Sequence, residues 1–231
     1  FYTMGCGVRT SLNKFGKDFI DRPICEVFRE HDLVFCNLES IISDKGMKPY
    51  SLRSMDMRGT PDMAVKLSGW GFNTVNVSNN HILEHGLDAA IDTVNQLKEC
   101  GLDIVGAGSQ ISFNNEIGVT KKTISGIDFY FFSLCLIDNK YTYNGGGSID
   151  DLFEKISAIK NEKNGMIIVT LHWGNEYVDR PEIEQMDLAE LLFDAGVSLL
   201  IGHHPHVYQG TTCSNNRLAA YSLGNFIFGD F

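Results

Sequence analysis

The sequence has few of the features that membrane proteins and nucleic-acid-binding proteins need. Its 231 residues contain no run of about 18 consecutive apolar residues, the length that a membrane-spanning helix requires, and no signal-peptide pattern opens the chain. Positive charge is scarce, since 19 Lys and Arg stand against 29 Asp and Glu, for a net charge of -10 and a pI near 5.1. We therefore expect no membrane span within this chain and no nucleic-acid partner.

Paired cysteines and a nucleotide-binding loop are also missing. The six cysteines include no CxxC pair, and Cys36 and Cys135 lie inside apolar runs, so we interpret the cysteines as reduced structural residues. The glycine pairs GCG (5–7) and GAG (106–108) are too short for a phosphate-binding loop and lack its lysine or spacing. Chemistry driven by ATP is therefore not expected of this chain alone.

Short apolar runs alternate with amphipathic stretches, a pattern that is typical of βα units and predicts an α/β fold. With 43% hydrophobic residues, the chain is long enough for one large domain, which we expect over residues 1–231. Strands are expected at 33–36, 72–77, 103–106, 129–137, 166–171, 198–201 and 218–223. Helices are expected at 24–30, 61–68, 87–97, 149–161 and 182–194, and a flexible loop at 138–148. In the third helix the expected buried face consists of Leu87, Ala90, Ile91, Val94 and Leu97, and Gly101 should end it.

Polar residues follow five of these strands. The segments are CNLES (36–40), SNNH (78–81), HWGNEY (172–177), GHHPH (202–206) and SLGNF (222–226). They hold five of the seven histidines in the chain: His81, His172, His203, His204 and His206. Ligands of open α/β sheets bind beyond the carboxyl ends of the strands, so we expect these segments to converge on one site.

The chemistry of the five segments favours a metal site. Imidazoles and carboxylates are ligands of zinc, manganese and iron, and the absence of cysteine from the histidine clusters argues against a structural thiolate zinc site. An extended backbone would point His204 and His206 to the same side. Each residue alone has an ordinary explanation: His172 as a hydrogen-bonded core histidine, Glu39 as a cap and Asn79–Asn80 as a turn. Their combination at the strand ends favours the metal site.

The ordered motifs NLE, NNH, HWGxEY, GHHPHV and YSLGNF resemble the CapA family, the bacterial capsule and poly-gamma-glutamate synthesis proteins. The resemblance covers about Val34 to Phe228, and Glu84 stands where an aspartate is commoner, which leaves the role of residue 84 open. It implies a layered α/β fold of the calcineurin-like metallophosphoesterase type, with a metal site at the carboxyl ends of the strands.

The same resemblance assigns roles to the site residues. Glu39 would bridge two divalent transition metals, which we expect to be zinc, manganese or iron, and Asn80 would supply a neutral oxygen. His172 and His204 would bind one metal and His206 the other, and the metals would generate hydroxide from water at neutral pH.

Other residues are expected beside the metals. His81 would be the general acid that protonates the leaving group. Six residues are expected to support the ligands or contact the substrate: Asn37, His203, Trp173, Glu176, Tyr177 and Asn225. For Trp173 and Tyr177 simple packing is the favoured alternative.

Two functions from different classes follow. One is a metal-dependent hydrolase or transferase that acts on a phosphoester or a gamma-linked amide during capsule or poly-gamma-glutamate synthesis. The other is a non-catalytic assembly or export component of a complex that synthesises an anionic polymer. The expected partners are accordingly an anionic polymer or phosphoester substrate and a polymer-synthase complex. The resemblance suggests a membrane-associated or cell-envelope location in bacteria.

Metallophosphoesterase-like sites normally open with an aspartate in a Gly-Asp pair, but this chain begins FYTMGCGVRT, with no acidic residue before Asp18. We expect that aspartate upstream of Phe1, so that the chain is truncated at one or both ends. A di-metal site with a single carboxylate leaves positive charge uncompensated, so metal occupancy should be weak. Residues 1–8 should then run along the metal crevice, with Phe1 close to Glu39 and His204.

Overall fold

The computed structural model describes residues 14–15, 19–46, 57–108, 113, 116–138, 143, 146–160 and 165–227. They have a mixed α/β architecture with parallel strands, as predicted, in two compact units. Unit 1 comprises Phe1–Val77, His81–Ile104 and Phe226–Phe231, and unit 2 comprises Ser78–Asn80 and Val105–Asn225. Among the helices in these ranges, none has the length and apolar character needed to cross a membrane. The expected position of Phe1 and residues 1–8 lies outside the described residues.

Unit 1 is built on a small sheet with the strand order β1-β4-β5. The strands are β1 (Phe35–Asn37), β4 (Thr74–Asn76) and β5 (Asp103–Val105), and β1 pairs with β4 in parallel. A second parallel pair joins β2 (Ile41–Ile42) and β3 (Arg58–Gly59). The helices are α2 (Arg22–Arg29), α3 (Asp62–Trp70) and α4 (Leu87–Glu99). The three strands of the small sheet and the helices α2, α3 and α4 were predicted, whereas β2 and β3 are too short to give a sequence signal.

The buried face of α4 differs from the predicted one. Ala90, Val94 and Leu97 are buried as expected, but Leu87 is exposed, and the polar residues Asp92 and Thr93 are buried. The reason is that these polar side chains hold residues 42–45, the end of β2 and the residues that follow it, which we call the β2 segment. This segment makes three contacts with α4: Ile42 N–H to Thr93 Oγ1 at 2.8 Å, Ser43 Oγ to Asp92 Oδ2 at 2.6 Å, and Lys45 Nζ to Asp92 Oδ1 at 2.6 Å.

The electrostatics of Asp92 follow from this arrangement. Burial acts to raise the pKa of its carboxyl group, but the hydrogen bonds from Lys45 and Ser43 outweigh burial, so the pKa is held below its usual value. The charged carboxylate therefore anchors the β2 segment to α4, and Glu39 lies two residues before that strand.

Unit 2 contains a six-stranded sheet with the order β10-β11-β9-β8-β7-β6. Its strands are β6 (Thr120–Ile124), β7 (Ile127–Cys135), β8 (Gly165–His172), β9 (Val197–His203), β10 (Thr211–Ser214) and β11 (Arg217–Ala220). The four central strands are mutually parallel, and the two edge strands are antiparallel to their neighbours. The central strands were predicted. The edge strands were missed because β6 carries Thr and Lys and all of β10 is exposed, so neither forms an apolar run.

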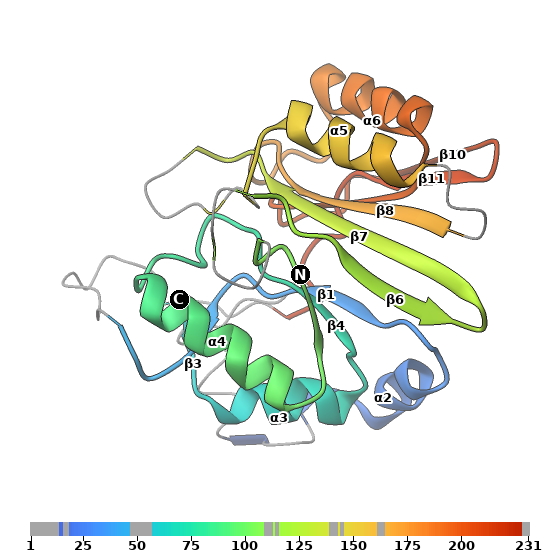
Figure 1. The fold of residues 1–231 in the computed structure, drawn as a ribbon. Coiled ribbons are helices and arrows are strands. Elements are labelled where there is room, and N and C mark those ends of the chain that lie inside the picture. Colours follow the sequence, from blue (N-terminus) through green and yellow to red (C-terminus); the bar gives the residue numbers. More distant parts are fainter. Residues whose placement is uncertain are drawn as a thin grey trace. The chain divides into compact units, whose positions relative to one another are not determined.

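The helices α5 (Ile149–Ile159) and α6 (Ile183–Ala195) lie side by side over one face of this sheet (Figure 1). Alternate residues of β8, Ile167, Val169 and Leu171, pack into the hydrophobic core beneath them. The strand period of two therefore points the intervening residues, including His172, toward the opposite face. Since β8 ends at His172 and β9 at His203, the histidine-rich segments begin where the parallel strands stop.

The five cysteines in the described part of the chain are free thiols, as expected. Cys25, Cys36 and Cys135 are buried, and burial raises the pKa of the Cys36 thiol to about 12, which keeps it protonated and inert. Cys213 differs, because it lies exposed on the edge strand β10.

Candidate metal centre

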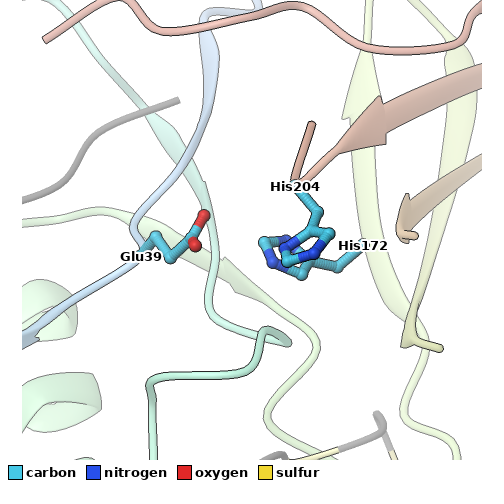
Figure 2. A group of neighbouring side chains, drawn as sticks. All are labelled: Glu39, His172 and His204. Carbon is cyan, nitrogen blue, oxygen red and sulfur yellow. The ribbon is translucent and has the colours of Figure 1, made fainter. Parts of the chain in front are cut away.

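In unit 1 the central acidic group is the carboxylate of Glu39, which follows β1 and is fully buried (Figure 2). Two asparagines at the ends of adjacent strands orient it. Asn76, at the end of β4, donates from Nδ2 to Asn37 Oδ1 at 2.8 Å, and Asn37, at the end of β1, donates from Nδ2 to Glu39 Oε2 at 3.3 Å. A chain of amide hydrogen bonds thus leads from the sheet to the carboxylate, with Asn37 as its last donor.

His81 lies in the turn between β4 and α4, hydrogen-bonded to one carboxylate of unit 1 and near a second. Its Nδ1 atom lies 3.0 Å from Glu84 Oε2, and its Nε2 atom lies 3.9 Å from Glu39 Oε1. The His81 side chain is 18% exposed, so it is not a core residue. Sequence reasoning left the role of residue 84 open, and in this structure Glu84 is the hydrogen-bond partner of His81.

In unit 2 three buried histidines and one asparagine lie together. His172 Nε2 lies 2.8 Å from Asn80 Oδ1, and the rings of His172 and His204 have centroids 5.0 Å apart (Figure 2). The rings of His204 and His206 follow at 6.3 Å. Ser78 ties the short segment with Asn80 to this unit, because its Oγ donates to Tyr143 O at 3.2 Å. Four predicted ligands therefore gather at the carboxyl ends of β8 and β9.

The backbone of the GHHPH segment corrects one expectation. We expected an extended backbone at His204 and His206, but φ is 97° and 62° at these residues, which are non-glycine residues in the positive-φ region. The chain bends at 204–207 directly after β9. Such conformations cost about 1–3 kcal/mol each and persist where the surrounding structure holds them, commonly at functional sites. The proximity of the two rings is therefore produced by a strained bend and not by strand alternation.

His203 and Trp173 lie in the interior of unit 2. His203 pairs with His172 in the β8–β9 register, and burial lowers the pKa of its imidazole well below the usual value, so the ring stays neutral. Trp173 belongs to the hydrophobic core, is 2% exposed, and donates from Nε1 to Tyr221 O at 2.9 Å. Packing, the favoured alternative for Trp173, accounts for its position.

The remaining predicted residues lie around His206. Asn225 Oδ1 is 3.0 Å from His206 Nδ1, and the Tyr177 ring is stacked on the His206 ring with centroids 5.5 Å apart and an interplanar angle of 17°. Tyr177 is nevertheless 64% exposed, so its place is not explained by packing in the core. Glu176 is exposed to solvent.

The donor groups of each unit are of the kinds that bind a divalent transition metal. Unit 2 offers the imidazoles of His172, His204 and His206 and the side-chain oxygen of Asn80, and unit 1 offers the carboxylate of Glu39. These nitrogen and oxygen groups suit zinc, manganese and iron. A cation would also offset the free-energy cost of keeping the Glu39 carboxylate away from water.

Residues 3–230 match the protein-family model described as bacterial capsule synthesis protein PGA_cap. The capsule biosynthesis protein CapA of Bacillus anthracis is 30% identical to this chain, over 97% of the chain and 57% of that protein. The PGA biosynthesis protein CapA of Bacillus subtilis (strain 168) is 28% identical, over 97% of the chain and 60% of that protein. The chain thus spans less than two thirds of the length of these relatives.

A solved structure has a similar fold. The crystal structure of a hypothetical protein from Thermus thermophilus matches with a TM-score of 0.53 and 20% sequence identity, over 87% of this chain and 68% of that one. At this identity the similarity shows a shared fold alone.

Proposed function

Because the chain belongs to the bacterial capsule synthesis family PGA_cap, we propose that it is a metal-dependent hydrolase or transferase in the synthesis of an anionic polymer such as poly-gamma-glutamate. The bond attacked is a phosphoester or a gamma-linked amide. The proposed fold is of the calcineurin-like metallophosphoesterase type, with residues 1–231 as one domain that acts at the bacterial membrane or cell envelope. Two ions, of zinc, manganese or iron, are held by Glu39, Asn80, His172, His204 and His206.

The observation that carries this proposal is the cluster of buried imidazoles beside Asn80 in unit 2. The side chain of Asn80 contacts His172 in unit 2, whereas that of the next residue, His81, lies near Glu39 in unit 1. Each unit therefore places one of these two successive residues beside its own donor groups, Asn80 beside the histidines and His81 beside the carboxylate.

The reaction uses few residues of this chain. Bound metal would supply activation of a water molecule and neutralisation of charge on the attacked group. The Nε2 atom of His81 would give its proton to the leaving oxygen or nitrogen. Glu84 would keep the His81 ring oriented by accepting a hydrogen bond from Nδ1–H, and Asn37 would hold the Glu39 carboxylate in place.

Elemental analysis combined with turnover tests the proposal. The chain is incubated separately with zinc, manganese and iron, desalted, and assayed on bis(p-nitrophenyl) phosphate and on a gamma-glutamyl peptide. We expect uptake of up to about two ions per chain, weakly held as the charge argument requires, and turnover of at least one substrate. The double variant His204→Ala with His206→Ala should lose at least one ion, whereas His31→Ala, an exposed histidine in unit 1, should lose none.

Two results would reject the proposed enzymatic function. Absence of metal uptake from all three solutions would remove the basis of catalysis and favour a non-catalytic component of a polymer-synthesis complex. Full metal occupancy without turnover of either class of bond would assign the metals a structural role.

A further inference from the structure

His206 is held between two side chains of unit 2 that reach it from different segments. Asn225, after the last strand, accepts a hydrogen bond at Oδ1 from the Nδ1 side of the ring at 3.0 Å. Tyr177, in the loop after β8, covers the face of the ring at 5.5 Å, nearly parallel to it. The hydrogen bond with Asn225 fixes the direction of the Nδ1 edge of the ring, and the stacking on Tyr177 fixes the plane of the ring.

The backbone at Tyr177 is strained in a way that packing does not explain. Its φ of 60° is in the left-handed region, which costs a bulky residue about 1–2 kcal/mol. The Tyr177 N–H donates to Pro205 O at 2.8 Å, and this bond ties the loop to the residue before His206. Gln209 strengthens the connection, because its Nε2 donates to the carbonyl oxygens of Val178 and Arg180 at 2.9 and 3.1 Å. A strained backbone thus presents a largely exposed tyrosine to one histidine.

We propose that Tyr177 and Asn225 are positioning residues that hold the His206 imidazole in a single tautomer and orientation, with Nε2 as the metal-binding nitrogen. The amide oxygen of Asn225 can only accept, so the Nδ1 atom of His206 must carry the proton and Nε2 is the unprotonated nitrogen. Stacking on Tyr177 prevents the ring from rotating out of this plane. The inference rests on the proposed function for the metal, but the ring geometry is a property of the metal-free protein.

Nuclear magnetic resonance of the metal-free chain tests the geometry. Two-bond proton–nitrogen spectra of labelled histidine, recorded well above the usual imidazole pKa of about 6.5, report the tautomer. We expect His206 to be protonated at Nδ1 in the wild type and to become a mixture of tautomers in Asn225→Ala. The ring protons of His206 should lose their upfield shift in Tyr177→Ala and keep it in Tyr177→Phe. Tyr208→Ala, at another exposed tyrosine two residues after His206, is the control that should change neither signal.

Metal affinity, measured by competition with a chromophoric chelator, tests the consequence. Loss of a residue that orients a ligand typically weakens metal binding about 10–100-fold. Tyr177→Ala and Asn225→Ala should therefore each lower the affinity for one of the two metals by this factor. Tyr177→Phe should bind as the wild type does. A wild-type His206 protonated at Nε2, or shifts unaffected by both alanine variants, would overturn the positioning role. If the spectra respond as expected but no metal binds, the positioning stands and the metal-dependent function falls.

Discussion

His81 Nδ1 lies 3.0 Å from Glu84 Oε2, and the two residues are only three positions apart in the turn before α4. The backbone of this turn is closed by a bond from Glu84 N–H to His81 O at 3.0 Å, so the local chain alone sets the pairing. The second ring nitrogen, Nε2, is directed to the Glu39 side. The turn therefore presents one nitrogen of a partly exposed histidine beside the buried carboxylate.

Replacement of His81 should separate catalysis from folding. We expect His81→Ala to lower turnover by roughly 10²–10⁴, the usual contribution of a positioned general acid, while metal content stays unchanged. The side chain is partly exposed and outside the core, so folding should be spared. Turnover, elemental analysis and circular dichroism measure the three quantities.

Glu84→Gln serves as the matched variant. Its amide oxygen can still accept from Nδ1 but carries no charge, so turnover should fall less than in His81→Ala. Loss of folding in His81→Ala would assign the histidine a structural role and remove it from the mechanism.

Metal binding should also stabilise the protein. A ligand that binds only the folded state adds about 2.7 kcal/mol at a free concentration of 100 times its Kd. The thermal midpoint should therefore rise with added metal and return to its starting value with a chelator. The double variant His204→Ala with His206→Ala should show a smaller rise than His31→Ala. Equal rises in these two variants would mean that the stabilising metal binds elsewhere.

The strand ends could be predicted from the sequence because hydrophobic runs and polar segments alternate sharply there. His172 follows the MIIVTL run and is the last residue of β8, and the GHHPH segment begins as β9 ends. The asparagine contacts were less visible. The family resemblance assigned Asn225 a role beside the ligands or the substrate, but not its partner His206, 19 residues earlier, because that contact depends on how the chain returns after β11.

Other features depend on tertiary contacts that override local pattern. The apolar spacing of α4 predicted a buried Leu87, yet Asp92 and Thr93 are buried because the β2 segment needs hydrogen-bond partners. The positive φ at His204 could not be predicted either, since residues before proline usually adopt extended conformations. Both differences arise where contacts between distant parts of the chain decide the local conformation.

Acid should weaken the attachment of the β2 segment to α4. The pKa of Asp92 is lower in the folded protein than in the unfolded chain, where it is about 3.9. Its contribution is therefore complete above about pH 4 and is lost as the pH falls through the folded pKa. At neutral pH Asp92→Asn should be less stable than the wild type by about 1 kcal/mol, because Lys45 is largely exposed and the ion pair is screened.

Urea unfolding at neutral and acidic pH measures this effect. The difference between Asp92→Asn and the wild type should shrink below about pH 4. Asp187→Asn, on the exposed surface of α6, is the control and should remain close to the wild type at neutral pH. A constant difference for Asp92→Asn across the whole pH range would contradict the assigned charge interaction.

Gly202, which opens the GHHPH segment, lies directly against the backbone of Tyr221. A Cβ atom added to Gly202 would overlap the carbonyl oxygen of Tyr221 and would also lie 2.6 Å from Trp173 Nε1. Backbone cannot yield as a flexible side chain can, and the Trp173 Nε1 to Tyr221 O bond joins the two groups that would have to separate. Gly202→Ala should therefore destabilise the chain by about 1–3 kcal/mol.

Gly69→Ala is the opposite case and the matched control. Gly69 lies inside α3 with nothing within 4 Å of an added Cβ, so alanine should stabilise the helix by about 0.5–1 kcal/mol. Urea unfolding of both variants gives the free energies. Because His203 and His204 directly follow Gly202, Gly202→Ala should also weaken metal binding, whereas Gly69→Ala should leave it unchanged. Wild-type stability in Gly202→Ala would show that β9 and the Tyr221 backbone are not packed as closely as the structure indicates.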